Sequence, residues 1–354
     1  MKTIFFVNAL KGSLSTQQIC SLQQYFNFPF VPISDGGDGF LETISYCLPK
    51  AKKHFIFTPN ALNKTKKVFY LIYKNTAFLE CAEIAGLAEI SLKNRKVLHA
   101  TSFGIGKVLK EIIKKGVKQI YIGLGGGGFN DGGAGCLQAL GYKLLDEENR
   151  EIPQGILGLL KLKKIIPPNK KIPQIICLSD VENKLFGKFG SAQVYGPQKG
   201  ANKKEVILIE KALKNFEKVI NKNLDKKFYG ASGALPMALC GVLKAKIKKG
   251  TAEIFKFIKA ENLIKKADLI LTSEGCLDKQ TLYGIAPFEI LKLTQKHKKK
   301  IVINCGKNQL KQSSLRKYTN LTVKEICALA KNEKDSFENA PKYLKKILGD
   351  YENH

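Results

Sequence analysis

The feature that most constrains the fold of this chain is a set of short, nearly uninterrupted apolar runs, each followed by a polar or glycine-rich loop. Runs of this length are typical of strands that are buried on both faces, as in a parallel sheet. They lie at Ile4–Val7, Gln119–Leu124, Gln174–Leu178, Leu269–Thr272 and Ile301–Asn304. Helical patterns follow several of them, so the sequence predicts a doubly wound α/β fold in which ligands bind beyond the carboxyl ends of the strands.

Two of these helices have clear starting signals. Ser15 and Gln18 are spaced as a capping box ahead of apolar residues at positions 19, 22 and 26, which share one helix face. A second apolar helix face spans residues 105–112, and Thr101 or Ser102 is its expected N-cap.

A different pattern fills the region between the first two parallel strands. Residues 53–57, 67–73 and 76–80 read as antiparallel strands, with a tight turn at Lys74 and Asn75. Because the chain has 354 residues, we expect about two domains, the second made of more than one stretch of chain. The basic stretches 161–171 and 243–250 are predicted to be surface connectors.

The net charge of +29 raises the question of a nucleic-acid partner. Arginine, whose planar fork reads guanine and phosphate, occurs only at positions 95, 150 and 316, and the lysines are spread along the chain. We therefore predict solvated surface lysines and no nucleic-acid partner, although the charge would help to attract anionic substrates.

Other composition features bear on location. No stretch reaches the roughly 18 uncharged apolar residues that a membrane helix needs, and residues 3–10 are too short and lack the cleavage site of a secretory signal. The nine cysteines are scattered singly without a C-x-x-C pair, which predicts reduced thiols rather than a zinc site or disulfides. We expect a cytoplasmic protein with no membrane partner, and the sequence leaves homo-oligomer formation open.

The first strand runs into a loop that is suited to phosphate. Lys11, Gly12 and Ser13 stand between this strand and the start of a helix, where free N–H groups and the positive end of the helix dipole favour anions. An ordinary strand-to-helix turn with a capping serine explains the segment equally well.

A second loop, residues 34–39, carries two carboxylates among three glycines. Asp35 and Asp38 could hold a metal or a hydroxyl group, or accept a proton, whereas Asp-Gly pairs are also common in plain turns.

The densest glycine segment spans residues 123–133 and contains Asn130 and Asp131. So much glycine costs folding entropy and makes sense where the backbone must approach a ligand closely. Gly123, Gly125 and Gly128 also match the dinucleotide fingerprint G-x-G-x-x-G, with Asp146 as a ribose contact, but that fingerprint normally follows the first strand of its fold. An NAD(P)-dependent oxidoreductase is therefore a weak alternative, and no Walker A loop is present.

Acids and a lysine collect at further strand ends. Asp180 follows the third strand, Glu274 and Asp278 follow the fourth, and Lys199 lies in a Gly-Pro turn. Carboxylates at several strand ends suit Mg²⁺, which prefers hard oxygen ligands. There is no G-x-S-x-G elbow, and the histidines lie outside these segments, which argues against a Ser-His hydrolase.

Taken together, these segments resemble the glycerate kinase family of bacteria over nearly the whole chain. The segments that carry the resemblance are, in chain order, Lys11-Gly12-Ser13-Leu14-Ser15, Ser34-Asp35-Gly36-Gly37-Asp38-Gly39-Phe40, Thr101-Ser102-Phe103-Gly104-Ile105-Gly106, Gly125-Gly126 with Asn130-Asp131-Gly132-Gly133-Ala134-Gly135, Asp180-Val181 with Asn183, Gly196-Pro197-Gln198-Lys199-Gly200-Ala201, and Glu274-Gly275 with Asp278, Gln280 and Thr281.

The resemblance implies two α/β domains with the active site in the cleft between them. One domain would be flavodoxin-like or Rossmann-like, over 1–50, 95–185 and 266–354, and the other, over 51–94 and 186–265, would be inserted. It also implies a small-molecule kinase that phosphorylates the organic acid D-glycerate with ATP and Mg²⁺, more commonly to 2-phosphoglycerate.

We assign roles to the matching residues as hypotheses for phosphoryl transfer, which needs positioning and neutralisation of charge. Phosphates or the glycerate carboxylate would be bound by Lys11, Gly12, Ser13, Gly125, Gly126, Gly127, Gly128, Asn130 and Lys199. The metal would be held by Asp180, Glu274 and Asp278, with Glu274 also near the nucleotide. The base would be Asp35, Asp131 or Asp180, among which the sequence does not choose.

The chain also departs from its relatives. They usually have Asp-Ser-Phe at Asn8-Ala9-Leu10, Ser-Ala-Thr at Gly127-Gly128-Phe129, Arg at Cys276 and Lys at Ile285. Loss of two cations and several hydroxyls would weaken stabilisation of the transition state. The alternative function is therefore a catalytically weakened paralogue that binds a small acid or a nucleotide as a sensor or partner protein.

Overall fold

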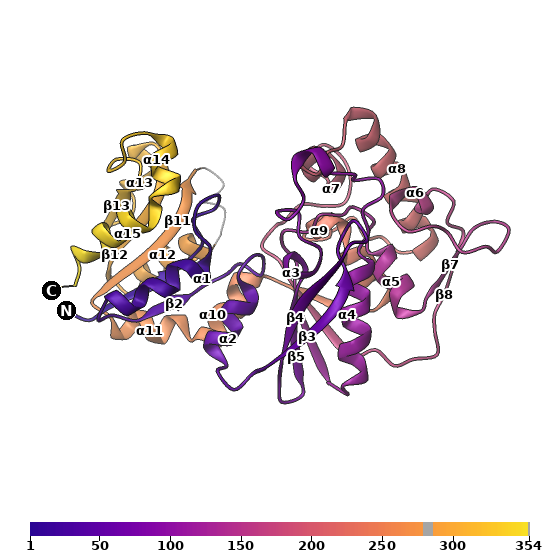
Figure 1. Cartoon of the computed structure of the whole chain (residues 1–354), viewed down its shortest axis with the longest axis horizontal. Helices are drawn as coiled ribbons and strands as arrows, with labels where there is room; N and C mark the ends of the chain where they lie inside the picture. Colours follow the sequence, from indigo (N-terminus) through magenta and orange to yellow (C-terminus); the bar gives the residue numbers. More distant parts are fainter. Residues whose placement is uncertain (279–285, 353–354) are drawn as a thin grey trace. The chain divides into compact units, whose positions relative to one another are not determined.

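The computed structural model describes residues 1–278 and 286–352, which divide into two compact units. Unit 1 comprises residues 1–35, 42–49 and 251–354, and unit 2 comprises residues 36–41 and 50–250. Both termini belong to unit 1 (Figure 1), so unit 2 is inserted into it along the chain.

Unit 1 contains a five-stranded sheet in which every neighbouring pair is parallel. Its strands are β1 (Thr3–Val7), β2 (Phe30–Pro32), β11 (Leu269–Leu277), β12 (Lys300–Asn308) and β13 (Leu321–Glu325), and the spatial order is β2-β1-β11-β12-β13. Numbered within the unit, this is the flavodoxin-like order 2-1-3-4-5. The order of strands reverses between β1 and β11, which makes their carboxyl ends the place where a ligand is expected.

Among the helices of unit 1, α1 and α15 pack on the same side of this sheet. Ile19 of α1 shares one buried core with Leu344 and Ile347 of α15 and with Phe5 and Leu271 of the strands. The helices are α1 (Thr16–Cys20), α2 (Phe40–Cys47), α10 (Gly250–Ile258), α11 (Ala260–Lys266), α12 (Ala286–Lys296), α13 (Gln312–Leu315), α14 (Glu333–Glu338) and α15 (Ala340–Gly349), with a 3-10 helix at Ser21–Tyr25.

Unit 2 is built on a six-stranded mixed sheet in the order β10-β9-β6-β5-β4-β3. The first four strands in this order pair in parallel, and β4 and β3 add an antiparallel edge. The strands are β3 (Lys52–Pro59), β4 (Thr65–Tyr73), β5 (Thr76–Glu80), β6 (Gln119–Gly123), β9 (Gln174–Leu178) and β10 (Lys246–Lys248), and β7 (Lys143–Leu145) with β8 (Lys164–Ile166) forms a separate hairpin.

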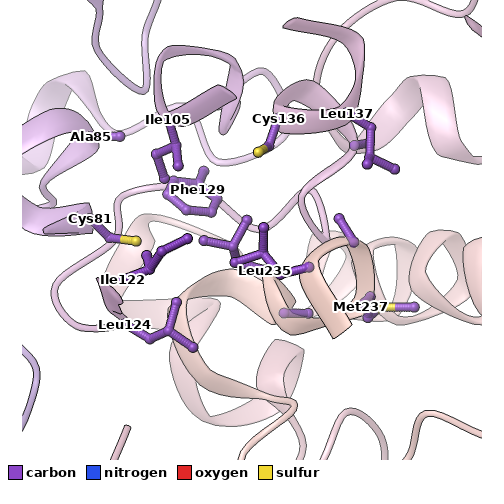
Figure 2. Packing of buried hydrophobic residues seen from close by; sticks show 14 of the residues in the cluster. Cys81, Ala85, Ile105, Ile122, Leu124, Phe129, Cys136, Leu137, Leu235 and Met237 are labelled. Carbon is purple, nitrogen blue, oxygen red and sulfur yellow. The ribbon is translucent and has the colours of Figure 1, made fainter. Parts of the chain in front are cut away.

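The glycine-rich segment of unit 2 contributes an aromatic ring to the core. Figure 2 shows Phe129 lying among Ile105, Ile122 and Leu235, and its side chain is fully buried. The helices of this unit are α3 (Cys81–Ala85), α4 (Phe103–Lys114), α5 (Ala134–Leu140), α6 (Ile156–Leu159), α7 (Ser191–Tyr195), α8 (Lys203–Ile220) and α9 (Ala231–Ala234), with 3-10 helices at Leu92–Asn94 and Pro197–Lys199 and a π-helix at Met237–Val242.

The predicted mixed α/β fold with parallel strands is confirmed, as are the three antiparallel strands and the capping box of α1. The predicted connectors at 161–171 and 243–250 were wrong in part, because each contains a short strand, β8 or β10. All nine cysteines are free thiols. None of the described helices is long and apolar enough to span a membrane.

The division of the chain differs from the predicted boundaries. Residues 95–185 were expected to pack with the first strand, but their strands β6 and β9 pair with β5 and β10 in unit 2. Residues 251–265, expected in the second domain, pack in unit 1. The reason is that a buried parallel strand has the same apolar pattern in either sheet, so its pattern does not identify its partners.

Candidate active site

In unit 1, the ends of β1 and β11 are fastened together directly above the sheet. The Asn8 N–H donates to Ser273 Oγ at 3.0 Å, and the same hydroxyl donates to Asn8 O at 2.6 Å. A Cβ atom on Gly275 would lie 2.7 Å from the Lys11 backbone nitrogen, so only glycine permits this close approach. These contacts fix the start of the Lys11 loop against the end of β11.

Glu274 is the buried carboxylate of this group, with a side chain held on two sides. Its Oε2 accepts from Asn8 Nδ2 at 3.0 Å, and its Oε1 accepts from the Gly275 N–H at 3.0 Å. Burial raises the pKa of Glu274 to about 7, the charge of Lys11 opposes this rise, and Asp35 adds to it. The structure thus brings four residues singled out from the sequence, Asn8, Lys11, Asp35 and Glu274, within electrostatic reach of one another.

The hydrogen bond to Glu274 gives a structural reason for an asparagine at position 8. Its amide donates a hydrogen bond to Glu274 that an ionised aspartate at this position could not donate. An aspartate there would place two carboxylates in contact and would favour a shared cation. In this chain the Asn8 amide supplies a hydrogen bond to the Glu274 carboxylate, so no cation is needed between the two side chains.

The predicted use of a helix dipole at Lys11 is not supported by the local geometry. Helix α1 has only five residues, and Ser15 already caps it by accepting from the Gln18 N–H at 3.1 Å. The exposed Lys11 side chain is therefore the anion-attracting group of this loop. Ser13 Oγ donates to Phe337 O at 3.1 Å, which ties the loop to α14.

In unit 2, two glycine-rich motifs pack against each other. A Cβ atom on Gly125 would lie 2.2 Å from Gly37 Cα, and one on Gly126 would lie 2.7 Å from Asp38 Oδ1. Glycine is therefore required because the two backbones nearly touch. Gly127 and Gly128 are buried, so that only the beginning of the segment, at Gly126, is exposed.

Asp131 lies at the centre of a closed network. Its Oδ2 accepts from Thr101 Oγ1 at 3.1 Å, from the Ser102 N–H at 2.8 Å and from Ser102 Oγ at 3.0 Å. The N–H groups of Gly133 and Gly135 also donate to this carboxylate, at 3.1 and 3.2 Å. Burial raises the pKa of Asp131, and these hydrogen bonds oppose the rise. Its surroundings are those of a residue that positions the glycine segment.

Ser102 was one of two expected caps for α4, and it does occupy the N-cap position. Its side chain makes no capping bond, because the hydroxyl donates to Asp131 and accepts from the Cys136 N–H at 2.9 Å. The serine therefore joins the start of α4 to α5.

Lys199 is also turned inward. Its ammonium donates to Phe129 O at 2.6 Å and to Asn130 Oδ1 at 2.7 Å, and its side chain is buried. Burial lowers the pKa of Lys199 to about 7, although the charge of Asp131 opposes the shift. Asn130 Nδ2 of this segment and Ser232 Oγ of α9, which lies close to Gly127, are buried without a hydrogen-bond partner, so this interior is polar and incompletely satisfied.

The lowered pKa of Lys199 leads to a testable pH dependence. The unfolded chain binds a proton here up to about pH 10 and the folded chain only up to about pH 7, so stability should rise with pH across this window. In urea unfolding at pH 7, 8 and 9, we expect Lys199→Met to remove a slope of up to about 1.4 kcal/mol per pH unit. The exposed-site control Lys203→Met should keep the slope of the natural chain, and an unchanged slope in both variants would contradict the assignment.

The proposed metal ligands lie in different units. Asp180 lies two residues after the end of β9 in unit 2, whereas Glu274 and Asp278 line one pocket in unit 1. Across residues 1–278 and 286–352, no three His, Cys, Asp or Glu side chains are grouped as a metal site. Gln280, Thr281 and Ile285, which figured in the family resemblance and its departures, lie outside the described residues.

The dinucleotide fingerprint finds no support in this geometry. Asp146, the expected ribose ligand, forms a turn with Arg150, whose Nε donates to Asp146 Oδ2 at 3.1 Å. The glycine segment also does not run directly into a helix, since α5 starts at Ala134. The fingerprint match in the sequence reflects only the high glycine content.

Lys307 and Phe337 line the pocket of unit 1 but belong to no sequence motif, so they were not identified from the sequence. Lys307 pairs in register with Cys276 on the neighbouring strand, and Phe337 contacts the Gly12 loop. The only sequence signal for Lys307 was its position a few residues after the apolar run of β12, at the predicted carboxyl edge.

Comparison with known proteins decides the family. The model of the glycerate kinase family matches residues 4–351. The chain belongs to the glycerate kinase family. The predicted family membership and the predicted kinase class are thereby confirmed.

Individual relatives agree with this assignment. A glycerate kinase of Neisseria meningitidis is 31% identical over 363 residues, covering 97% of this chain and 96% of its own. A glycerate 2-kinase of Escherichia coli is 31% identical over 320 residues, covering 85% and 84%. A crystal structure assigned to glycerate kinase 2 of Salmonella typhimurium LT2 is similar with a TM-score of 0.75 at 26% identity, covering 99% of both chains.

Proposed function

We propose that this chain transfers the terminal phosphoryl group of ATP to a hydroxyl group of D-glycerate. The observation that carries the proposal is the family match over residues 4–351, which includes every strand end discussed above. Relatives named glycerate kinase and glycerate 2-kinase span most of the chain, and the latter name favours 2-phosphoglycerate as the product.

Mg²⁺ fits the acids present in unit 1. Protein sites for this ion usually contribute one or two carboxylates and leave the remaining positions to phosphates and water. Glu274 and Asp278, which line the same pocket as Lys11, could supply such a pair. When bound, the ion would neutralise charge on the transferring phosphoryl group. Asp180 stays a proposal for the same role.

The chain's own groups would perform the remaining work. Lys11 would bind phosphate oxygens, because its ammonium is exposed in a pocket that is otherwise rich in acids. The base that accepts the hydroxyl proton would be Asp35 or Asp180, which are both partly exposed. We assign Asp131 and Lys199 to positioning the segment from Gly125 to Asn130, because both side chains are fully engaged within unit 2.

The test is a coupled assay for ADP release with purified protein. We expect release only when ATP, D-glycerate and Mg²⁺ are all present, because the pocket acids would otherwise repel the phosphates. Product analysis by ³¹P NMR should show 2-phosphoglycerate. Thermal stabilisation by ATP or D-glycerate without turnover would instead support the catalytically weakened paralogue, and turnover that is unaffected by chelation of Mg²⁺ would contradict the metal assignment.

A further inference from the structure

Unit 1 has a pocket of about 380 Å³ at the carboxyl edge of its sheet. The loops after β1, β11, β12 and β13 all contribute to its lining, together with α14 and the start of α15. It therefore includes the reversal point between β1 and β11, where a flavodoxin-like strand order places a ligand.

Two glycines, Gly275 and Gly306, line this pocket. A Cβ atom on Gly306 would lie 2.5 Å from Gly275 O, and one on Gly275 would lie 2.7 Å from the Lys11 backbone nitrogen. The ends of β11 and β12 thus present bare backbone to the pocket. A bare backbone with exposed peptide groups suits close approach by a flat or phosphorylated ligand.

The lining is divided between charge and apolar surface. Lys11 and Lys307 supply positive charge at the ends of β1 and β12, with the acids Glu274, Asp278 and Glu333 around them. The apolar part of the lining consists of Leu10, Ile326, Phe337 and Ala340. Phe337 is 48% exposed, so its ring has a free surface.

Lys307 lies beside Cys276 on the neighbouring strand. The two residues are paired across β11 and β12, and the charge of Lys307 lowers the pKa of the Cys276 thiol against the larger effect of burial.

From this division we infer that the pocket binds the nucleotide rather than the acid acceptor, an inference that rests on the proposed kinase function. A three-carbon hydroxy acid has little apolar surface to place against the Phe337 ring, and it would fill little of the volume. Pockets of roughly 300–1,000 Å³ with apolar walls and a few polar groups hold cofactors. The purine packs against the exposed ring of Phe337, and the phosphates extend toward Lys11 and Lys307.

Two half-buried thiols, Cys276 and Cys327, line this pocket and can report on it. The intact protein is treated with N-ethylmaleimide, and labelling of each cysteine is followed by mass spectrometry. ATP and adenosine, each at ten times its Kd, should slow labelling of these two thiols about tenfold by mass action. Labelling of the half-buried Cys47 and Cys240 should not change, and D-glycerate alone should not protect.

A matched pair of variants tests the aromatic wall without relying on thiol reactivity. Stacking of a base on an aromatic ring contributes about 1–3 kcal/mol, so Phe337→Ala should raise the Kd of ATP, measured by calorimetry, by roughly tenfold. The control Phe57→Ala removes an exposed ring from β3 and should leave the Kd unchanged. Both variants should melt at the temperature of the natural protein.

The outcomes separate this inference from the proposed function. Protection by ATP without any ADP release on adding D-glycerate would support the nucleotide pocket and contradict the kinase assignment. Turnover without protection by ATP, or protection by D-glycerate alone, would overturn the nucleotide pocket while leaving the kinase assignment intact. An unchanged Kd in Phe337→Ala would overturn the aromatic contact that carries the inference.

Discussion

Replacing Asp131 by alanine is expected to lower the free energy of unfolding of unit 2 by roughly 3–5 kcal/mol, as is typical when one partner of a buried charged network is removed. Donors from Thr101, Ser102, Gly133 and Gly135 would lose their acceptor in a region without water access. Each unsatisfied buried donor costs about 1–3 kcal/mol. Since whole proteins are stable by only about 5–15 kcal/mol, this single change approaches the limit of folding.

The variant Asp131→Asn keeps the shape of the side chain but removes its charge. Its side-chain oxygen can still accept from Ser102, so we expect a smaller loss, whereas the exposed-site control Glu148→Ala should change stability little. Urea unfolding measures the total loss in the free energy of unfolding, and amide hydrogen exchange shows which elements lose protection. Faster exchange in α4 and α5, with β1 and β11 unaffected, is the expected pattern. A loss below about 1 kcal/mol in Asp131→Ala would show that water or rearrangement satisfies the donors.

How much of this could be read from the sequence depends on the range of the interactions. Apolar runs predicted β1, β6, β9, β11 and β12, because burial on both faces leaves a continuous apolar pattern. The capping box of α1 was equally accessible, since its partners are three residues apart.

The distribution of these strands between two sheets was not accessible. β5 and β6 are neighbouring strands, with Phe78 paired to Tyr121. Nothing in either apolar run specifies that pairing. The short strands β8 and β10 were missed because three residues give no measurable period. The boundary prediction failed for the same reason.

The candidate site shows the same limit in its side chains. The sequence identified Asp131 and Lys199 as polar residues near glycines, and the structure places Lys199 in the 3-10 helix Pro197–Lys199, after helix α7 and not after a strand. The sequence could not reveal that both side chains turn inward, because that depends on Ser102 and Phe129, which lie far away along the chain. Phe337 carried no signal, since an exposed ring in a short helix is ordinary.

The other large effect is expected at Lys11. Replacing it by methionine keeps the length and apolar character of the stem but removes the charge, and we expect kcat to fall by roughly 10²–10³-fold, as when one stabilising group is lost from a transition state. The substitution should change kcat more than it changes the KM for ATP. The reason is that Lys11 would stabilise negative charge that develops as the phosphoryl group is transferred. Lys11→Arg, which retains the charge, should recover part of the rate.

The backbone of Lys11 is fixed by its contact with Gly275, so the substitution should leave the fold intact and the melting temperature unchanged. Lys265→Met is the matched control, because it removes a lysine charge from the surface of α11 in the same unit. That control tests whether the net charge of +29 acts on anionic substrates at long range. Equal losses in the two variants at low salt, both abolished at high salt, would mean that Lys11 acts only as part of the general field. A loss confined to Lys11→Met and insensitive to salt would instead place its ammonium on the phosphates themselves.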